Sequence, residues 1–410
     1  MGALRRAPQN PKEGSALDCY HQAFLLPLHP TLMRDATRII RSTLTKAVPG
    51  EPLQIGPVFA APFHAPGDPK DNPYTYARSH NPTWTALERA IAQMESGKLL
   101  SGEDNQASVL IFSSGMAAIT AVFGAVLRPG DIVVLPPNSY YTARLLLQQY
   151  FTQMGIVLRM APSAGNTPKD LLNGAKLLWL ESPSNPGMEI SDIAALCDAA
   201  HKTGALVAVD NTTPTPMGQL PLSLGADLSI ASDTKSLTGH SDLLLGHVAV
   251  RSPELHKKLD QWRTLTGSIV GPMEAWLALR SLATLPLRLE RCCQNAQRIA
   301  EFLTTRKEVE AVFYPGLPSH PGHQIATRQM SFFGPVLSFV LHSQAAAETF
   351  FANSALLTEA TSFGGISTTA ERRARWGGDA VAPGFIRLSA GCEAIEDLLA
   401  DIAQALDAIP

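Results

Sequence analysis

Short apolar runs and amphipathic stretches alternate along the middle of the chain. Runs typical of buried strands occupy residues 109–112, 132–135, 156–160, 177–180, 206–209, 228–231 and 247–250. Stretches with helical spacing of apolar positions lie among them, at residues 82–94, 113–127, 141–154 and 190–203. This alternation predicts an α/β fold, with a mainly parallel seven-stranded sheet between helices.

The two ends of the chain have a different pattern. Residues 1–80 hold one helical stretch, roughly residues 30–46, and then a Pro/Gly-rich segment with little apolar surface, so we interpret them as an arm. Residues 81–272 form the predicted large domain. Residues 273–410 form a smaller α+β domain, whose predicted elements are a long linking helix (273–306), strands at 336–341 and 385–389, and a last helix (394–406).

Composition excludes several classes of protein. The chain has 410 residues, 45% of them hydrophobic, which is enough for large cores. A net charge of −3 without a basic block argues against a nucleic-acid partner. No apolar run is long enough for a bilayer, and the basic start lacks a signal core, so we expect a cytoplasmic protein. The five cysteines are odd in number and form no C-x-x-C pair, which favours packing roles.

Four polar motifs directly follow predicted strands. They are residues 113–116, 181–186, 210–211 and 232–235. Because the carboxyl ends of parallel strands share one edge of a sheet, and ligands bind at that edge, we expect the four motifs to form one site.

Lys235 and Asp210 suggest the chemistry of this site. The lysine lies between Thr234 and Ser236 in a segment expected to be buried, where an unpaired ammonium is costly. Asp210 ends an apolar strand, where a lone carboxylate is equally costly. A reactive amine, nearby hydroxyls for a phosphate and an acid for a pyridine nitrogen are the groups that pyridoxal 5'-phosphate (PLP) requires.

Two further features fit a site of this kind. Gly115 and Met116 open a helix, whose first N–H groups have no partner within the helix and can bind a phosphate. Arg387 interrupts an apolar strand. Its guanidinium could pair with a structural acid or clamp a substrate carboxylate, and the sequence leaves both open.

Together these motifs resemble the Cys/Met-metabolism PLP enzymes, from about residue 50 to the end of the chain. The resemblance is carried by YAR with NPT (76–83), SSGMAA (113–118), ESPSNP (181–186), DNT (210–212), SDTK with GHSD (232–242) and RLS (387–389).

The resemblance implies a fold-type I PLP enzyme in which Lys235 holds the cofactor and moves protons, and Asp210 binds the pyridine nitrogen. Ser232, Thr234 and the amides of Gly115 and Met116 would hold the phosphate. Arg387, with Asn185 and Ser362, would bind the carboxylate of an amino-acid substrate, and Asn185 would also contact the cofactor. Tyr140 would stack on the cofactor ring and move protons as a catalytic residue, with Tyr141 as the alternative. Tyr76 and Arg78 would reach the phosphate of a neighbouring subunit, which implies a homo-oligomer, as a dimer or a dimer of dimers, with shared sites.

The chain departs from the family where substrates are selected. It has Tyr141-Thr142-Ala143 after Tyr140 where the family often has Gly-Gly-Thr, Thr361 where a glutamate is common, and a different segment at 371–378. The expected activity is that of a carbon–sulfur lyase, with γ-elimination from L-cystathionine as the first hypothesis. The activities of methionine γ-lyase, cystathionine γ-synthase and cystathionine β-lyase are alternatives.

Two other classes remain as hypotheses. One is a PLP-fold binding protein without turnover, which the joint presence of Lys235, Asp210 and Arg387 disfavours. The other is a metal enzyme built on His240, Asp242 and His247, or on His320 and His323. Each of these sets lies in Gly/Pro-containing loops and lacks a further nearby ligand, so we expect no metal.

Overall fold

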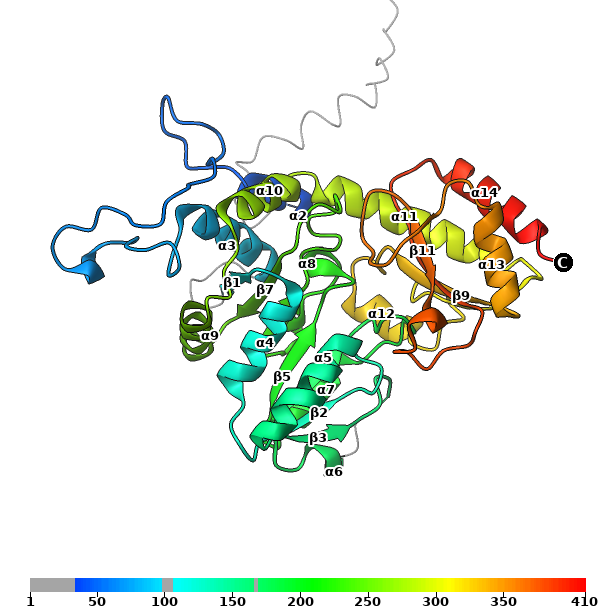
Figure 1. Ribbon diagram of the computed structural model, residues 1–410, viewed down its shortest axis with the longest axis horizontal. Coiled ribbons are helices and arrows are strands. Elements are labelled where there is room, and N and C mark those ends of the chain that lie inside the picture. Colours follow the sequence, from blue (N-terminus) through cyan, green and yellow to red (C-terminus); the bar gives the residue numbers. More distant parts are fainter. Residues whose placement is uncertain (1–33, 98–105, 166–168) are drawn as a thin grey trace, which may run out of the picture.

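Two β-sheets, joined by one long helix, organise the molecule (Figure 1). The computed structural model describes residues 34–97, 106–165 and 169–410. The linking helix α11 (Leu285–Leu303) contributes Leu285 and Leu289 to the core beside the larger sheet. Its second half contributes Ile299 and Leu303 to the core of the smaller sheet.

The larger sheet contains all seven strands that the sequence predicts. They are β1 (Ser108–Phe112), β2 (Ile132–Leu135), β3 (Val157–Met160), β4 (Ala175–Glu181), β5 (Leu206–Asp210), β6 (Leu228–Ala231) and β7 (Gly246–Val250), in the order β1-β7-β6-β5-β4-β2-β3. Four neighbouring pairs are parallel, and only β7 runs antiparallel to its neighbours β6 and β1. The prediction of a mainly parallel sheet is therefore confirmed.

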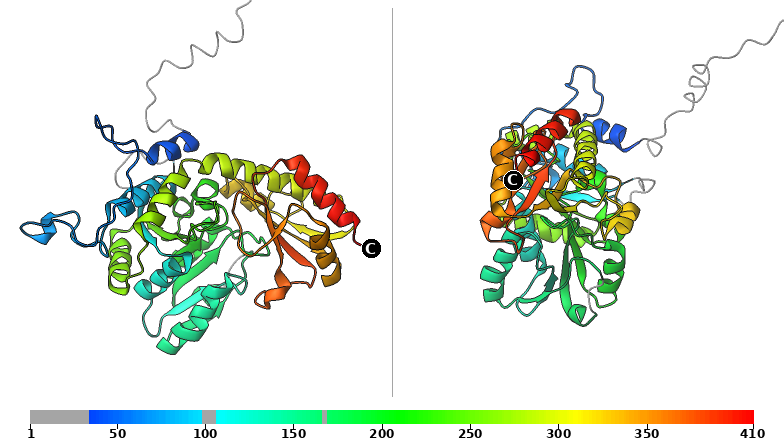
Figure 2. Two further views of the ribbon diagram at one scale, coloured as in Figure 1. Left: turned by 45° about the horizontal axis from the view of Figure 1, so that its top comes forward. Right: turned by 90° about the vertical axis from the view of Figure 1, so that its right-hand side faces the viewer.

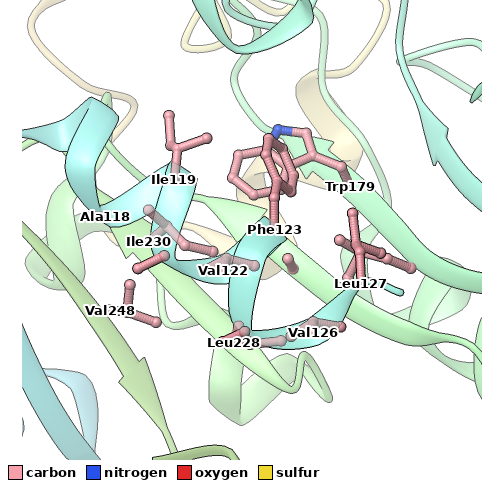
Figure 3. Packing of buried hydrophobic residues seen from close by; sticks show 14 of the residues in the cluster. Ala118, Ile119, Val122, Phe123, Val126, Leu127, Trp179, Leu228, Ile230 and Val248 are labelled. Carbon is pink, nitrogen blue, oxygen red and sulfur yellow. The ribbon is translucent and has the colours of Figure 1, made fainter. Parts of the chain in front are cut away.

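Apolar side chains on both faces of the sheet explain why helices cover both. In β4, Leu177 and Trp179 join the core under α4, whereas Leu178 and Leu180 join the core under α7. Figure 3 shows residues of α4 beside β6 and β7, with Phe123 close to Trp179. Their ring centroids are 5.0 Å apart. Burying an aromatic or aliphatic side chain of this size contributes about 1.5–3 kcal/mol.

The helices that surround the larger sheet follow. They are α3 (Pro82–Glu95), α4 (Gly115–Val126), α5 (Tyr141–Leu146), η4 (Leu147–Phe151), η5 (Thr152–Met154), α6 (Lys169–Leu172), α7 (Ile193–His201), α8 (Thr215–Gly218), η6 (Pro221–Leu224), α9 (Pro253–Thr266) and α10 (Pro272–Leu282). Helices α4 and α9 pack on one face of the larger sheet, and helices α3, α7 and α10 pack on the other.

The smaller sheet has five strands in the order β10-β11-β12-β9-β8. They are β8 (Val309–Phe313), β9 (Val336–Leu341), β10 (Thr358–Glu359), β11 (Thr369–Arg372) and β12 (Phe385–Ser389), with α12 (His323–Gln329), α13 (Gln344–Asn353), η7 (Arg373–Trp376) and α14 (Ile395–Asp407). Strands β9 and β12 match their predictions. Strands β8, β10 and β11 were not predicted, because none of them is a fully buried apolar run.

The prediction of one helix over residues 273–306 is wrong. Two helices, α10 and α11, are separated by Ala283 and Thr284. Pro286 lies in the first turn of α11, where its missing N–H is tolerated, and it could not continue a hydrogen-bond ladder from α10. The predicted helix at 141–154 likewise divides into α5 and two short irregular turns, η4 and η5.

The first part of the described chain reaches away from the main body. Helix α2 (Asp35–Ser42) is shorter than the predicted helix and packs through Ile39 against the core that contains α3. The segment after it, including η2 (Pro69–Asp71), is drawn in blue and extends outward in Figures 1 and 2. It is mostly exposed or half-buried. The predicted boundaries at residues 80 and 272 stay predictions.

Two remaining expectations concern membranes and cysteines. Within the described ranges, no helix combines the length and apolarity that a bilayer crossing requires. Cys197, Cys292 and Cys293 are buried free thiols, and Cys392 is a half-buried free thiol. Cys19 lies outside the described residues.

Candidate active site

A cavity of about 250 Å³ lies at the carboxyl ends of the larger sheet's central strands. The ends of β4, β5 and β6 and the start of α4 form most of its walls. Phe363, in the loop between β10 and β11 of the smaller sheet, completes them. The lining residues are Ser114, Gly115, Met116, Ile119, Tyr140, Glu181, Asn185, Asp210, Thr212, Thr213, Ser232, Thr234, Lys235, Leu244 and Phe363. The four polar motifs of the sequence thus meet in one place.

Two buried carboxyl groups stand side by side in this cavity. Asp210 and Glu181 are opposite residues in the parallel pair β5–β4. Oδ1 of Asp210 accepts hydrogen bonds from the amide and the hydroxyl of Thr212, at 3.0 and 2.6 Å. Burial raises the pKa of Asp210 despite these bonds and the nearby Lys235 charge. A carboxyl group in this state is ready for a cationic N–H partner.

Glu181 had no role in the sequence interpretation. Its Oε2 accepts a hydrogen bond from the backbone N–H of Tyr140, at 2.6 Å. Burial, and then the charge of Asp210, raise its pKa well above the ordinary value. The signal that identified Asp210, an acid at the end of an apolar strand, is also present at Glu181 and could have identified it.

The start of α4 forms a tight cradle beside β6. Ser114 caps the helix by accepting a hydrogen bond from the Ala117 amide at 3.1 Å. A Cβ atom on Gly115 would lie 2.6 Å from the Cβ of Ser232, so only glycine fits there. The first amides of a helix lack partners within it and can bind an anion. Glycine therefore keeps these amides close to Ser232.

Thr234 lies on the cavity wall but already has partners. Its hydroxyl accepts from the amide of Leu245 at 3.0 Å and lies 3.2 Å from the carbonyl oxygen of the same residue. Of the two predicted phosphate hydroxyls, Ser232 is thus the one beside the helix amides. The amides of the cradle suit a phosphate, Asp210 suits a pyridine N–H, and the Lys235 amine suits a carbonyl carbon, so these residues fit PLP.

Lys235 links the two sides of the site. Its Nζ donates a hydrogen bond to the Ser362 hydroxyl at 2.6 Å and lies 5.3 Å from the centroid of the Phe363 ring. Burial, followed by the charge of Arg387, lowers the pKa of Lys235 to about 8. Ser362 has a φ of +80°, a strained conformation for a residue other than glycine, and such strain is common at functional sites.

Arg387 on β12 approaches the cavity from the smaller sheet. Its Nη1 donates to Asn185 Oδ1 at 2.8 Å, and its Nη2 donates to the Ser362 carbonyl oxygen at 3.0 Å. Nη2 also donates to the buried carboxylate of Glu371. The sequence allowed a structural acid or a substrate clamp, and the structure shows that Arg387 has an acid partner while it adjoins the cavity through Asn185.

The predicted tyrosines occupy different places. Tyr140 lines the cavity, whereas Tyr141 packs against Gly378 and lies beneath the guanidinium of Arg144, 5.5 Å from ring centroid to Cζ. The geometry favours Tyr140 as the residue that meets a bound ring. Tyr76 and Arg78 do not line this cavity, and Arg78 donates to the Thr264 carbonyl oxygen at 2.7 Å.

A family model for the Cys/Met metabolism PLP-dependent enzymes matches residues 58–407. The chain belongs to this family. It is 52% identical to a putative cystathionine γ-lyase of Streptomyces coelicolor, over 91% of this chain and 93% of that protein. It is 38% identical to a cystathionine γ-lyase of Bacillus subtilis, over 82% of this chain and 89% of that protein.

A solved structure of a related enzyme has the same fold as this chain. The crystal structure of cystathionine γ-synthase from Xanthomonas oryzae pv. oryzae, in complex with aminoacrylate and cysteine, superposes with a TM-score of 0.85 at 34% identity, covering 94% of this chain and 99% of that chain. The family, the relatives and the solved structure together show that the protein is a PLP-dependent enzyme of sulfur-amino-acid metabolism. The resemblance, the fold class and the cofactor expected from the sequence are confirmed.

The histidines considered as metal ligands have other partners in this family member. His247 is buried, with Nδ1 2.7 Å from Asp233 Oδ1 and Nε2 3.1 Å from Glu95 Oε1. Although burial lowers it, the two acids raise the pKa of His247 to about 10. Nδ1 of His240 lies 2.6 Å from the Thr238 carbonyl oxygen. Within residues 34–97, 106–165 and 169–410, no group of three or more acid, histidine or cysteine side chains is suited to hold a metal ion.

Proposed function

We propose that the enzyme is a cystathionine γ-lyase, which cleaves the Cγ–S bond of L-cystathionine. With one water molecule, the products are L-cysteine, 2-oxobutanoate and ammonia. The observation that supports this proposal most is that the Lys235 amine and the Arg387 guanidinium both lie near the Phe363 ring, 5.3 and 5.2 Å from its centroid, with Ser362 hydrogen-bonded to both. This arrangement suits an amino acid whose carboxylate binds Arg387 while its α-carbon faces Lys235. The 52% identity to a putative cystathionine γ-lyase supports this choice of reaction.

The residues of the chain would divide the work as follows. When bound, PLP supplies an electron sink for the negative charge that develops on the substrate. The Lys235 amine removes the α-proton, and a pKa of about 8 leaves a useful fraction of it neutral near pH 7. Arg387 and Asn185 orient the carboxylate, and Asp210 accepts a hydrogen bond from the pyridine N–H. Ser232 and the amides of Gly115 and Met116 would hold the phosphate, with Thr234 beside them on the cavity wall although its hydroxyl also bonds Leu245, and Tyr140 would pack on the ring.

The exposed arm supports a second part of the proposal, a shared site in a homo-oligomer. Tyr76 is 47% exposed, and the guanidinium of Arg78 lies 5.7 Å from its ring centroid. Both residues lie outside this chain's own cavity. We place them at the phosphate of a neighbouring subunit, so each site takes residues from two chains.

Product analysis tests the reaction. The purified enzyme with PLP is incubated separately with L-cystathionine, L-methionine and O-acylated homoserine plus L-cysteine, and products are identified by mass spectrometry. We expect 2-oxobutanoate and cysteine from cystathionine. Pyruvate and homocysteine would instead identify a β-lyase, methanethiol a methionine lyase, and cystathionine formation a synthase. Lys235→Ala is the control and should lower turnover by at least about 10⁴-fold.

The same preparation distinguishes an inactive binding protein. A visible cofactor absorbance that changes with amino acids, without any product from the panel, would favour a protein that binds PLP without turnover and would overturn the lyase proposal.

Mixing two inactive variants tests the shared site. Lys235→Ala and Arg78→Ala chains are unfolded, mixed in equal amounts and refolded together. If Arg78 acts in the neighbouring subunit, half of the dimers are mixed and each has one intact site, so about a quarter of the wild-type activity returns. No recovery, in a sample in which two differently tagged chains are shown to co-purify as mixed dimers, would contradict the shared site.

A further inference from the structure

Glu371 is a fully buried acid directly opposite Arg387. The two residues are register partners in the antiparallel pair β11–β12, and their exposed fractions are 0% and 4%. Side chains at opposite positions of such a pair lie on the same face of the sheet. Because two unpaired charges would be very costly at this depth, the pair is held together before any substrate arrives.

Glu371 is itself fixed by several donors. Its Oε1 accepts from Arg373 Nη1 at 2.7 Å in addition to Arg387. Its Oε2 accepts from Trp376 Nε1 at 2.8 Å and from Arg375 Nη2 at 3.3 Å. Burial alone would raise its pKa, but the charge of Arg387 and these donors leave the pKa of Glu371 below its ordinary value. The carboxylate is therefore ionised and has little freedom to rotate.

The segment after Glu371 reaches the helix that follows Tyr140. Nε and Nη2 of Arg373 donate to Asp379 at 2.9 and 2.6 Å. The carbonyl oxygen of Gly378 accepts from Arg144 on α5 at 3.2 Å. A Cβ on Gly378 would lie 3.1 to 3.3 Å from the ring of Tyr141, also on α5. We name residues 371–379 the brace, because they connect β11 and Arg387 with the start of α5.

The partners of Arg387 limit which of its N–H groups can bind a substrate. Nη2 donates to both Ser362 and Glu371, so its two hydrogens are used. Nη1 uses one hydrogen for Asn185. The remaining Nη1 hydrogen and Nε–H have no acceptor among the residues that the structure describes and are left for a ligand, so the direction of the guanidinium matters more than its charge alone.

We propose that Glu371 is a positioning residue for Arg387, which sets the guanidinium orientation that selects substrates with an α-carboxylate. This inference rests on the proposed role of Arg387 in the reaction. Glu371 acts through Arg387 and has no contact with the substrate. Arg373, Arg375 and Trp376 serve Glu371 by fixing its carboxylate.

Binding of an unreactive amino acid and of its amine analogue tests the proposal on the PLP-loaded enzyme. L-Alanine and ethylamine differ by the carboxylate, and each is titrated while the cofactor absorbance is followed. The dissociation constant of ethylamine divided by that of L-alanine measures how strongly the enzyme prefers a ligand with a carboxylate. We expect that ratio to fall about tenfold in Glu371→Gln, which removes the charge, and also in Glu371→Asp, which keeps the charge but shortens its reach.

Two variants control for folding and for charge. Glu359→Gln removes an acid that is 43% exposed and that, within the described part of the chain, forms an ion pair with Arg375 alone, so its ratio should stay within about twofold of wild type. Trp376→Phe removes one hydrogen bond to Glu371 from a side chain that is 57% exposed, and its ratio should fall about threefold without loss of folding. Thermal melting of each variant confirms that it is folded.

The outcomes separate this inference from the proposed function. An unchanged ratio in Glu371→Gln or a wild-type ratio in Glu371→Asp, in folded protein, would overturn the positioning role. A wild-type enzyme that binds ethylamine as well as L-alanine would overturn the role of Arg387 and this inference with it. If the ratio falls in both Glu371 variants while cystathionine is not cleaved, Glu371 keeps its role and the proposed reaction fails.

Discussion

The two walls of the site satisfy their charges in different ways. On the wall from the larger sheet, Oδ1 of Asp210 accepts two hydrogen bonds from Thr212, and Oδ2 has no donor among the residues that the structure describes. On the wall from the smaller sheet, Arg387 already donates to Asn185, Ser362 and Glu371. On the first wall, one carboxylate oxygen of Asp210 is therefore left for the cofactor N–H that we propose to bind there, whereas the second wall is organised before a substrate binds.

The largest effect on turnover should follow from removing the negative charge of Asp210 on the first wall. Asp210→Asn keeps the size of the side chain but removes the anion beside the pyridine nitrogen, and we expect kcat to fall about a thousandfold for every substrate. Steady-state kinetics at saturating PLP measures this. Thr212→Val is the matched control, because it keeps the Asp210 charge and removes the 2.6 Å hydroxyl bond to Asp210 together with the 2.8 Å bond that this hydroxyl accepts from the Ser232 amide. Its loss should be about tenfold. Equal losses in the two variants would contradict an open acid on this wall.

Arg387→Lys changes the second wall instead. It keeps the positive charge and removes the planar fork, so we expect kcat/KM for amino-acid substrates to fall about a hundredfold, mainly through KM. The affinity for PLP should stay unchanged, which equilibrium dialysis can measure. Arg375→Lys changes an arginine that contacts Glu371 but not Arg387, and should lose less than about threefold. A large loss of PLP affinity in Arg387→Lys would show that the two walls are not separate.

The same contrast explains how far the sequence could be interpreted. Six of the seven strands of the larger sheet are short, largely buried apolar runs, whereas the edge strand β3 is exposed or half-buried. The polar groups of the first wall directly follow four of the buried strands, so their meeting at one edge was predictable. Glu371 lies on a four-residue strand without such a run. Its contact with Arg387 depends on the register of β11 against β12, which local pattern does not encode.

One wrong prediction and one choice that the sequence left open can also be explained by the structure. The single helix expected over 273–306 ignores Pro286, which begins a new helix after a turn. The choice between Tyr140 and Tyr141 could not be made from spacing, because it depends on Gly378, which packs against Tyr141 from the other side of the site. The departures from the family pattern at residues 361 and 371–378 indicated the region in which substrates are selected, but not the contacts that its residues make.

The lowered pKa of Lys235, on the first wall, should make the rate of PLP uptake depend moderately on pH. Only the neutral amine can attack the cofactor carbonyl, and the pKa of Lys235 is lowered to about 8. The rate of PLP uptake by the apoenzyme should therefore rise about tenfold per pH unit below pH 8 and level off above it. Stopped-flow absorbance measures this rate. A rate that still rises steeply up to pH 10 would contradict the lowered pKa.

The effect of the same lysine on stability has a definite sign. A lysine pKa that is lower in the folded state means that the folded state binds fewer protons than the unfolded state between pH 8 and about 10.5. The cost of burying the ammonium is therefore fully present below pH 8 and is lost as the pH rises through this window. Lys235→Met removes the cost, so its gain in melting temperature over wild-type apoenzyme should shrink from pH 8 to pH 10.

The smallest effect separates two adjacent tyrosines that belong to different walls. Tyr140 lines the cofactor cavity, and we expect Tyr140→Phe to lower kcat about tenfold through loss of a hydroxyl that can move protons. Tyr141 contacts Gly378 and Arg144 through its ring, which Tyr141→Phe retains, so kcat and KM should stay within about twofold of wild type. Tyr141→Ala removes the ring that meets the brace and should weaken carboxylate selection while leaving PLP affinity intact. If Tyr141→Phe loses more turnover than Tyr140→Phe, the hydroxyl that matters belongs to Tyr141, and the boundary between the two walls lies one residue later in the chain.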